Sequence, residues 1–393
     1  MFNTDTVARF NDLETPFYYY DLNLLKQTLQ ACYDASSKYN FHVHYAMKAN
    51  FDPKVLAAIQ SFGFGADSVS GNEVKAAIDN GFGAGKVVFA GVGKSDKEIN
   101  YALDADIFCF NVESVQELGV INDLAKAKGK TAKVAIRINP NVDAHTHKFI
   151  TTGLDENKFG VDIWQLPSVI EALRATTNIE FLGIHFHIGS QITDMEVFKT
   201  LCVKVNELDQ WFNDQGFAIN VLNVGGGLGV DYYRPDINAI PDFEAYFKIF
   251  AENLTVKEGQ EVHFELGRAL VAQCSSLISR VLFVKNGQHK NFLILDAGMT
   301  DLIRPMLYQA YHQIDNISSD HGPSNMDHGQ KVMIKYDVVG PICESTDRFR
   351  EDVLLPESVR GDIVAVRTAG AYGAVMISNY NLRDRVPSVY SVE

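Results

Sequence analysis

The sequence predicts an α/β protein in which a (β/α)8 barrel is followed by a C-terminal antiparallel β domain. Short apolar, β-branched runs alternate with longer amphipathic stretches through the first two thirds of the chain. About eight such strand–helix units fall within roughly 240 residues, which is the size of a closed barrel of this kind. After about residue 270, strand-like runs follow one another across short turns that contain Gly and Asn.

The barrel strands are expected where apolar runs end in polar residues. Strand–helix alternation implies parallel pairing with right-handed crossovers, and therefore a TIM-like barrel. A doubly wound open sheet is the alternative fold, but the number of units is too large for it. The expected strands are 41–47, 65–69, 86–90, 106–111, 133–138, 181–187, 221–224 and 261–265.

The change in rhythm sets the expected domain limits. We place the barrel at 22–268 and the β domain, expected to be sandwich-like, at 269–393. The N-terminal segment 1–21 contains PFYYYD, a strand-like run that we expect to join the β domain.

Composition excludes several classes of protein. Of the 393 residues 46% are hydrophobic and 21% charged, as in soluble globular proteins. A net charge of −14 argues against binding nucleic acid or an anionic membrane as the main task. The five cysteines include no CxxC pair, and neither a signal peptide nor a membrane span is visible. We therefore expect a cytoplasmic protein.

Functional residues of a (β/α)8 barrel lie where its strands end. Lys48 ends the apolar run FHVHYAMK, and an amine delivered by an apolar strand is partly desolvated and so nucleophilic at neutral pH. In NVGGGLG, three glycines (225–227) follow a buried strand, and their N–H groups would form a nest for a phosphate. A tight turn is the alternative interpretation of these glycines.

Two histidines lie two residues apart in GIHFHIGSQ. Their positions put the side chains of His185 and His187 on the same face of a strand, as in a metal-binding pair. A metal site needs further ligands, and His145 and His147 have no carboxylate close in sequence. We therefore expect no metal, and prefer a histidine that lies flat against an aromatic ring.

Glu265 leaves the last expected barrel strand, three residues before Arg268. A structural ion pair is the simpler interpretation of this spacing. A buried glutamate that keeps a ring nitrogen protonated would instead make that ring an electron sink. A lysine for an imine, glycines for a phosphate and a glutamate for a pyridinium together describe a site for pyridoxal 5′-phosphate (PLP).

Motifs along almost the whole chain carry a resemblance. The sequence resembles the diaminopimelate decarboxylases, within the alanine-racemase/ornithine-decarboxylase class of PLP enzymes. The order and number of the shared motifs decide this, and no single motif does. They are YAMKAN, SGNE, NVES, RINP, TTGLDENKFG, HFHIGSQ, GGGLG, ELGR, DAGMTDLIRPMLYQAYH, DVVGPICESTD and GAYGAVMISNYN.

The resemblance implies which residues hold the cofactor. Lys48 corresponds to the lysine that binds PLP covalently, His187 to the histidine stacked on the pyridine face, and Glu265 to the acid at the ring nitrogen. The remaining residues at the cofactor, mostly on its phosphate side, are Gly226, Gly227, Gly267, Arg268 and Tyr372.

The resemblance also implies a shared active site in a homodimer. Cys343 and Glu344 match residues that reach into the partner subunit's site, and Cys343 or a nearby group is the expected proton donor. A substrate whose far end carries a carboxylate and an ammonium needs cations and an acid there. The residues expected to bind substrate are Arg268, Arg304, Tyr308, Glu344 and Tyr372.

The activity that follows is the PLP-dependent decarboxylation of meso-2,6-diaminopimelate to L-lysine and CO2, the last step of lysine biosynthesis. The alternatives are a decarboxylase of another basic amino acid, a racemase, and a non-catalytic PLP-binding homologue. Leu266 and Thr346 stand where the family usually has a proline and a glycine. Both lie beside functional residues and replace none of them.

Overall fold

The computed structural model describes residues 2–142, 157–318, 326–327 and 330–392. The chain divides into two compact units. The barrel unit comprises Thr28–Gly229 and Pro241–Leu270, and the β unit comprises Met1–Gln27, Val230–Ile240 and Val271–Glu393. The segment Val230–Ile240 thus interrupts the barrel unit and groups with the β unit. The exact domain limits of 22–268 and 269–393 stay a prediction.

Parallel strands close the barrel, and all eight expected strands are confirmed. They pair in chain order, and β10 pairs with β2 at the closure. A short additional strand, β7 (Val161–Asp162), pairs with β6. The barrel strands are β2 (His42–Ala46), β3 (Gly65–Ser68), β4 (Val87–Phe89), β5 (Cys109–Val112), β6 (Ala132–Asn139), β8 (Ile179–His185), β9 (Val221–Asn223) and β10 (Glu261–Leu266).

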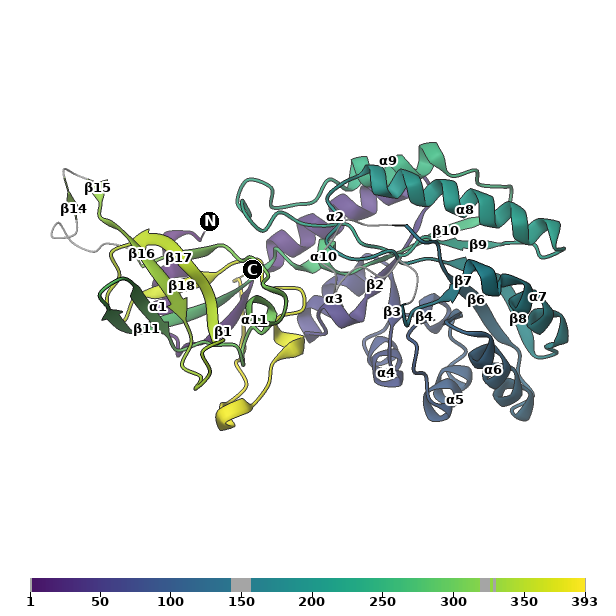
Figure 1. Ribbon diagram of the computed structural model, residues 1–393, viewed down its shortest axis with the longest axis horizontal. Coiled ribbons are helices and arrows are strands. Elements are labelled where there is room, and N and C mark those ends of the chain that lie inside the picture. Colours follow the sequence, from purple (N-terminus) through teal and green to yellow (C-terminus); the bar gives the residue numbers. More distant parts are fainter. Residues whose placement is uncertain (1, 143–156, 319–325, 328–329, 393) are drawn as a thin grey trace. The chain divides into compact units, whose positions relative to one another are not determined.

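Helices lie outside the barrel strands, as α4 to α7 show in Figure 1. Their starts follow from polar caps: Ser95 and Glu98 form a capping box at the start of α5. In α8 the apolar face contains Phe198 and Phe212, which are fully buried. The helices are α2 (Leu22–Ser37), α3 (Pro53–Ser61), α4 (Gly71–Asp79), α5 (Asp96–Asp104), α6 (Val115–Ala127), α7 (Leu166–Ala175), α8 (Glu196–Asp214), α9 (Phe243–Asn253) and α10 (Arg268–Val271).

The β unit is a mainly antiparallel sheet in the order β13-β18-β11-β12-β16-β17, with β1 paired to β11 and to β19. The expected N-terminal strand of this unit is therefore confirmed. Its elements are α1 (Thr4–Asn11), β1 (Phe17–Tyr20), β11 (Ser275–Asn286), β12 (Asn291–Leu295), α11 (Arg304–Tyr308), β13 (Ile314–Asn316), β14 (Met326–Asp327), β15 (Gln330–Lys331), β16 (Met333–Val339), β17 (Arg348–Pro356), β18 (Ile363–Val366) and β19 (Ser388–Tyr390).

The two units have separate apolar cores. In the barrel unit, Phe247 and Phe250 of α9 pack edge-on against Phe264 of β10, with ring centroids 4.9 and 5.0 Å apart. In the β unit, Phe10 of α1 packs on Phe17 and Tyr19 of β1. Among the described residues, no helix combines the length and the apolar character that a membrane crossing requires.

Candidate active site

Lys48 follows the first barrel strand directly. It lies in a short 3₁₀ helix, η1 (Met47–Ala49), whose other two residues are buried. The hydroxyl of Tyr45 donates a hydrogen bond of 2.7 Å to the carbonyl of Asn50, which ties the strand end to the turn. The Lys48 side chain is 37% exposed, and its Nζ lies 3.7 Å from Oδ2 of Asp67 on β3. The amine is therefore accessible at the carboxyl end of the barrel.

Asp67 is the nearest acid to this amine among the described residues, and it is buried. Within the described part of the chain, neither of its carboxylate oxygens has a hydrogen-bond partner. Burial, followed by the negative charge of Glu265, raises the pKa of Asp67 to about 8. Burial therefore favours the neutral form of Asp67 beside Lys48.

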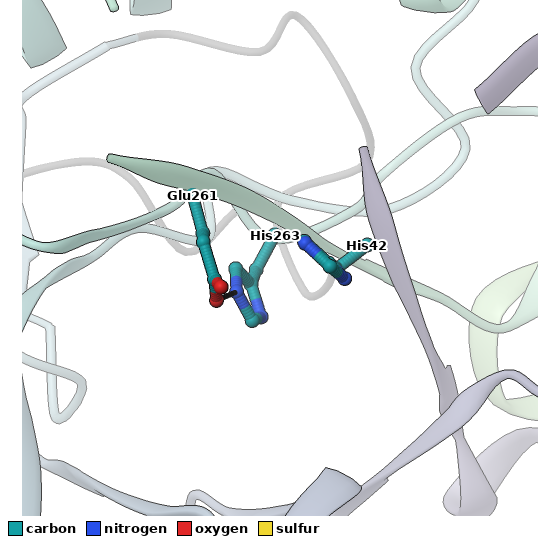
Figure 2. Close-up of side chains that lie close together, drawn as sticks. All are labelled: His42, Glu261 and His263. Atoms are coloured by element: carbon teal, nitrogen blue, oxygen red, sulfur yellow. Dashed lines mark hydrogen bonds and ion pairs between the residues drawn. The ribbon is translucent and has the colours of Figure 1, made fainter. Parts of the chain in front are cut away.

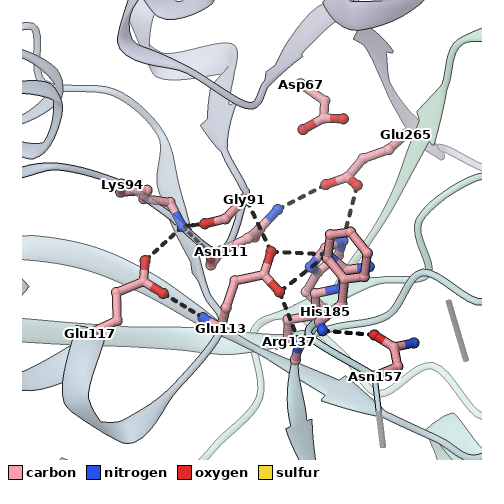
Figure 3. Close-up of polar contacts among 12 residues, drawn as sticks. Asp67, Gly91, Lys94, Asn111, Glu113, Glu117, Arg137, Asn157, His185 and Glu265 are labelled. Atoms are coloured by element: carbon pink, nitrogen blue, oxygen red, sulfur yellow. Dashed lines mark hydrogen bonds and ion pairs between the residues drawn. The ribbon is translucent and has the colours of Figure 1, made fainter. Parts of the chain in front are cut away.

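Glu265 on β10 is held as a carboxylate by three N–H donors, of which Figure 3 shows Asn111 and His185. The side-chain amides of Asn111 and Asn223 both donate to Oε1 at 2.8 Å, and His185 Nε2 lies 2.9 Å from Oε2. Burial alone would raise the pKa of Glu265, but His185, through its charge and its hydrogen bond, and then His187 and Lys48 outweigh burial and hold it well below the usual value. Glu265 is thus a fixed negative charge in the barrel interior.

His187 follows strand β8, and its ring is neutral. The backbone N–H of Gly226 donates to its Nδ1 at 3.4 Å. Burial, assisted by the positive charges of Lys48 and Arg137, lowers the pKa of His187 well below its ordinary value. The other histidine of this motif, His185, contacts Glu265, so it acts here as a hydrogen-bond donor. The other proposed metal ligands, His145 and His147, lie outside the described residues.

The glycine turn after β9 requires the absence of side chains. A Cβ on Gly225 would lie 2.1 Å from the carbonyl oxygen of Phe186, and one on Gly226 would lie 1.9 Å from that of Glu265. Gly225 and Gly227 also have positive φ angles, +69° and +108°. The turn therefore keeps its backbone close to β8 and β10, which fits a nest of N–H groups for a phosphate.

Arg268 begins α10, directly after the buried Gly267. Its guanidinium donates to the hydroxyl of Ser190, from Nε at 3.2 Å and from Nη2 at 3.0 Å. Ser190 follows the histidine motif after β8, so these bonds join the ends of β8 and β10. The sequence places Leu266 before Gly267, and Leu266 is buried at the end of β10.

A second polar network, formed by two ion pairs, surrounds Asn111 (Figure 3). Lys94 Nζ donates to the carbonyl of Asn111 at 2.8 Å and to Oε1 of Glu117 at 2.6 Å. Arg137 on β6 donates from Nη1 to both oxygens of Glu113, at 2.9 and 3.2 Å. Because both ion pairs are largely buried, they fix the ends of β5 and β6 and hence the direction of the Asn111 amide.

In the β unit, Arg304 is a buried arginine at the start of α11. Its Nη2 donates to the hydroxyl of Tyr232 at 3.3 Å, and its Nε donates to His312 Nε2 at 3.4 Å. Tyr308 ends the same helix and is half-buried. Asp301, three residues before Arg304 and an alternative ion-pair partner for it, accepts through one carboxylate oxygen from the N–H of Gly298.

The remaining predicted residues of the β unit lie on loops. Cys343 is exposed, with its Sγ 3.4 Å from the side-chain amide of Asn381. Glu344 accepts a hydrogen bond of 2.8 Å from the hydroxyl of Tyr380. Tyr372 has a φ of +57°, a left-handed conformation that is strained for a tyrosine. Thr346 is exposed.

Comparison with known proteins identifies the family. Residues 24–272 match the family described as "Pyridoxal-dependent decarboxylase, pyridoxal binding domain". A diaminopimelate decarboxylase of Bacteroides thetaiotaomicron is 53% identical over 386 residues, which cover 98% of this chain and 97% of the relative. This chain belongs to the diaminopimelate decarboxylase family. The resemblance inferred from the motifs is thereby confirmed.

Other family members agree with this assignment. The diaminopimelate decarboxylase of Aquifex aeolicus is 40% identical over 376 residues, covering 95% of this chain and 86% of the relative. The crystal structure of the Helicobacter pylori diaminopimelate decarboxylase complexed with L-lysine has a TM-score of 0.90 and 36% identity, and the match covers 98% and 94% of the two chains. The barrel followed by a β domain is thus the fold of this family.

As a pyridoxal-dependent decarboxylase, the chain uses PLP as its cofactor, and the barrel residues fit it. The glycine turn leaves space for a phosphate, Lys48 supplies an accessible amine, and Glu265 is an ionised acid. The individual roles given to these residues stay predictions. Sequence reasoning gave no role to Asn111, Asn223 or Asp67, although Asn111 and Asp67 lie at strand ends, where polar residues are informative.

Proposed function

We propose that this chain decarboxylates meso-2,6-diaminopimelate to L-lysine and CO2, the last step of lysine biosynthesis, in the cytoplasm. The observation that carries the proposal is Glu265, a buried carboxylate with three N–H donors in a chain 53% identical to a curated diaminopimelate decarboxylase. A racemase or a non-catalytic homologue is less well supported, because the chain keeps the lysine and the thiol of the family.

The barrel residues divide the work on the cofactor. Bound PLP supplies an electron sink, because its protonated pyridine ring takes up the electron pair that departing CO2 leaves. The carboxylate of Glu265 favours the protonated ring nitrogen by its charge. His187 would hold the pyridine ring, and the amine of Lys48 would hold the cofactor covalently.

Asp67 affects the charge around the bound cofactor. As a neutral acid beside Lys48, it adds no second negative charge next to Glu265, so the carboxylate of Glu265 alone acts on the ring. Gly226, Gly227, Gly267 and Arg268 would hold the phosphate of the cofactor.

We assign selection of the substrate to polar residues of the chain. Arg304 and Tyr308 of the β unit and Arg268 of the barrel unit bind the distal carboxylate, since an arginine offers two parallel donors to a carboxylate. Glu344 takes the distal ammonium, and Tyr372 contacts the cofactor and the substrate. Ornithine lacks the distal carboxylate, so a decarboxylase of ornithine has no use for Arg304 in this role.

Cys343 and Glu344 act in the partner subunit's site of a homodimer, and the Cys343 thiol gives a proton to the substrate carbon that has lost CO2. Lys48→Ala and Cys343→Ala proteins are each expected to be nearly inactive. Mixed and allowed to exchange subunits, they should recover part of the activity, because one intact site then forms from two damaged chains. If exchange is demonstrated and no activity returns, the shared site is wrong.

The substrate is tested by measuring CO2 release and lysine formation from meso-diaminopimelate, with ornithine and lysine as competing substrates. We expect a strong preference for diaminopimelate. A preference for ornithine or lysine would replace the substrate assignment with a decarboxylase of another basic amino acid. Absence of any turnover in a protein that carries PLP on Lys48 would favour the non-catalytic homologue.

A further inference from the structure

The opposite end of the barrel contains a histidine cluster to which the proposed reaction gives no role. His42 and His44 are the first and third residues of β2, and Glu261 and His263 are the first and third residues of β10. In the parallel pairing of these strands His263 lies opposite His42. Residues two apart share a face of a strand, so Glu261 and His263 lie on the face of β10 from which Glu265 contacts the barrel interior.

These side chains line a cavity of about 380 Å³. The rings of His42 and His263 stack with centroids 4.8 Å apart. One possible ligand atom from each of His42, Glu261 and His263 lies within 4.8 Å of the others. Figure 2 shows the three side chains coming together from the two neighbouring strands.

Hydrogen bonding determines which nitrogen of His263 carries a proton. The carbonyl of Lys86 lies 3.0 Å from His44 Nδ1, and since a carbonyl only accepts, Nδ1 of His44 is the protonated nitrogen. The other nitrogen of His44, Nε2, is then an acceptor, and it lies 2.8 Å from Nδ1 of His263. His263 therefore donates from Nδ1, which leaves a lone pair on its Nε2.

That lone pair faces another acceptor. Nε2 of His263 lies 3.0 Å from Oε2 of Glu261, and a carboxylate is an acceptor only. Two acceptors at this distance require a cation between or beside them. The possible cations are a proton, which would place a charged imidazolium in a buried position at a cost in desolvation, and a metal ion.

We propose that His42, Glu261 and His263 bind a divalent transition-metal ion of the zinc class. Two imidazole nitrogens and one carboxylate oxygen are a donor set that zinc uses, with water in the fourth position. His44 acts as the outer-sphere partner: it accepts from the far nitrogen of His263 and is itself fixed by the Lys86 carbonyl, which is the arrangement that orients histidine ligands. The cavity leaves room for the water.

The position of this site gives it a structural role. β2 is the first barrel strand and β10 the last, so a metal held by both links the seam at which the barrel closes. The ion joins residues more than 200 positions apart in sequence and binds the folded chain in preference to the unfolded one. It therefore stabilises the barrel by RT ln(1 + c/Kd), where c is the free metal concentration, so the free energy of unfolding rises with the logarithm of the metal concentration above Kd.

The test uses the untagged holoenzyme, freed of metal by a chelator and titrated with ZnCl2 by calorimetry and by thermal unfolding. We expect one strong site per chain, and a rise in Tm of roughly 5–10 °C at a hundredfold excess over Kd. His42→Asn and Glu261→Gln should each weaken zinc binding by at least about tenfold while the PLP content stays that of the wild type. His289→Gln, which removes an exposed histidine of the β unit, is the matched control and should bind zinc normally.

Zinc that binds the two cluster variants as well as it binds the wild type is adventitious, and the proposal is then overturned. A wild type without a strong site overturns it as well. If Glu261→Gln loses the site and His42→Asn keeps it, the ligand set is wrong. None of these outcomes bears on the decarboxylation, because zinc binding and PLP content are measured without substrate.

Discussion

Two glutamates on the same face of strand β10 have opposite surroundings. Glu265, near the carboxyl end, accepts from Asn111, Asn223 and His185, all within 2.9 Å. Glu261, at the amino end, faces the lone pair of His263 at 3.0 Å. The protein itself therefore matches the charge of Glu265 with donors, whereas at the other end of the barrel the proposed metal ion would match the charge of Glu261.

The carboxylates at the two ends of the barrel are balanced in different ways. A carboxylate surrounded by donors keeps its charge whether or not a ligand is bound, which suits an acid that acts on a cofactor throughout a reaction. Acceptors without a matching donor suit an ion that stays bound. The variants described below test this difference, from the largest expected effect to the smallest.

Lys48→Ala should have the largest effect. Removal of the amine that binds the cofactor should lower kcat to below about 0.1% of wild type and abolish the visible absorption band of the lysine-bound cofactor. Lys97→Ala, at an exposed lysine of α5, is the control and should leave both unchanged. Substantial turnover in the Lys48 variant would show that the reactive amine lies elsewhere.

Arg304→Leu tests whether this buried arginine of the β unit binds the distal carboxylate of the substrate. Breaking such a buried pair costs roughly 3–5 kcal/mol, which corresponds to a loss of about two to three and a half decades of kcat/KM on meso-diaminopimelate. Trace activity on lysine, which lacks the second carboxylate, should change little, so the preference narrows. The assay is CO2 release from both substrates, with Arg360→Leu at an exposed arginine as the control.

An unchanged ratio between diaminopimelate and lysine in the Arg304 variant would mean that this arginine does not read the carboxylate. A folding defect is distinguished by the thermal unfolding of the variant and by its PLP content, which a selective loss of substrate binding does not alter.

Glu265→Gln tests whether the negative charge of the Glu265 carboxylate is needed for the reaction. A neutral amide cannot keep the ring nitrogen protonated, and its NH2 group would meet either the donor His185 or the amides of Asn111 and Asn223. We expect PLP to stay bound and kcat to fall by about 10²-fold or more. The comparison with Glu258→Gln, at an exposed glutamate before β10, isolates the site. Wild-type turnover in Glu265→Gln would disprove the electron-sink role.

Asp67→Asn should have the smallest effect, seen in stability and not in rate. Asp67 keeps its proton up to a pKa of about 8 in the folded chain but loses it near pH 4 when unfolded. Between these values the folded state binds one more proton, so Asp67 makes the wild type less stable as pH rises from about 4 to about 8. The histidines with lowered pKa values act in the opposite direction in both proteins and cancel in the difference.

The measurement is urea unfolding of the full-length chain without cofactor at pH 5, 6, 7 and 8. The free energy of unfolding of the wild type minus that of Asp67→Asn should decrease steadily over this range. A difference that is independent of pH would mean that Asp67 is ionised beside Lys48, and that the negative charge is shared between two acids.

Much of the fold could be predicted, because strand and helix periods are local properties. The runs that end at Lys48 and Glu265 are apolar and short enough to be strands, and the eight barrel strands lie where the sequence indicated. Polar residues at strand ends also pointed to the active-site end of the barrel. Spacing alone does not decide whether the three glycines after β9 form a phosphate nest or only a turn. The family motifs assign them to the phosphate.

The partners of these residues could not be predicted in the same way. Asn111, Asn223 and His185 come from three strands, and their convergence on Glu265 depends on the barrel's closure. Asp67 reads as an ordinary acid until its burial is known. His42 and Glu261 are distant in sequence and lie at strand starts, whereas functional residues of a (β/α)8 barrel are expected at strand ends.

The short segment Val230–Ile240 has a consequence for the modularity of this protein. The chain passes between the two units at residues 27–28, 229–230, 240–241 and 270–271. A single cut near residue 269 would therefore not separate the two units. The barrel fragment would still carry two segments of the β unit, Met1–Gln27 and the loop that contains Tyr232. Exchange of the β unit between family members requires three segments to be replaced together, and recombination at one junction would separate Arg304 from its native Tyr232.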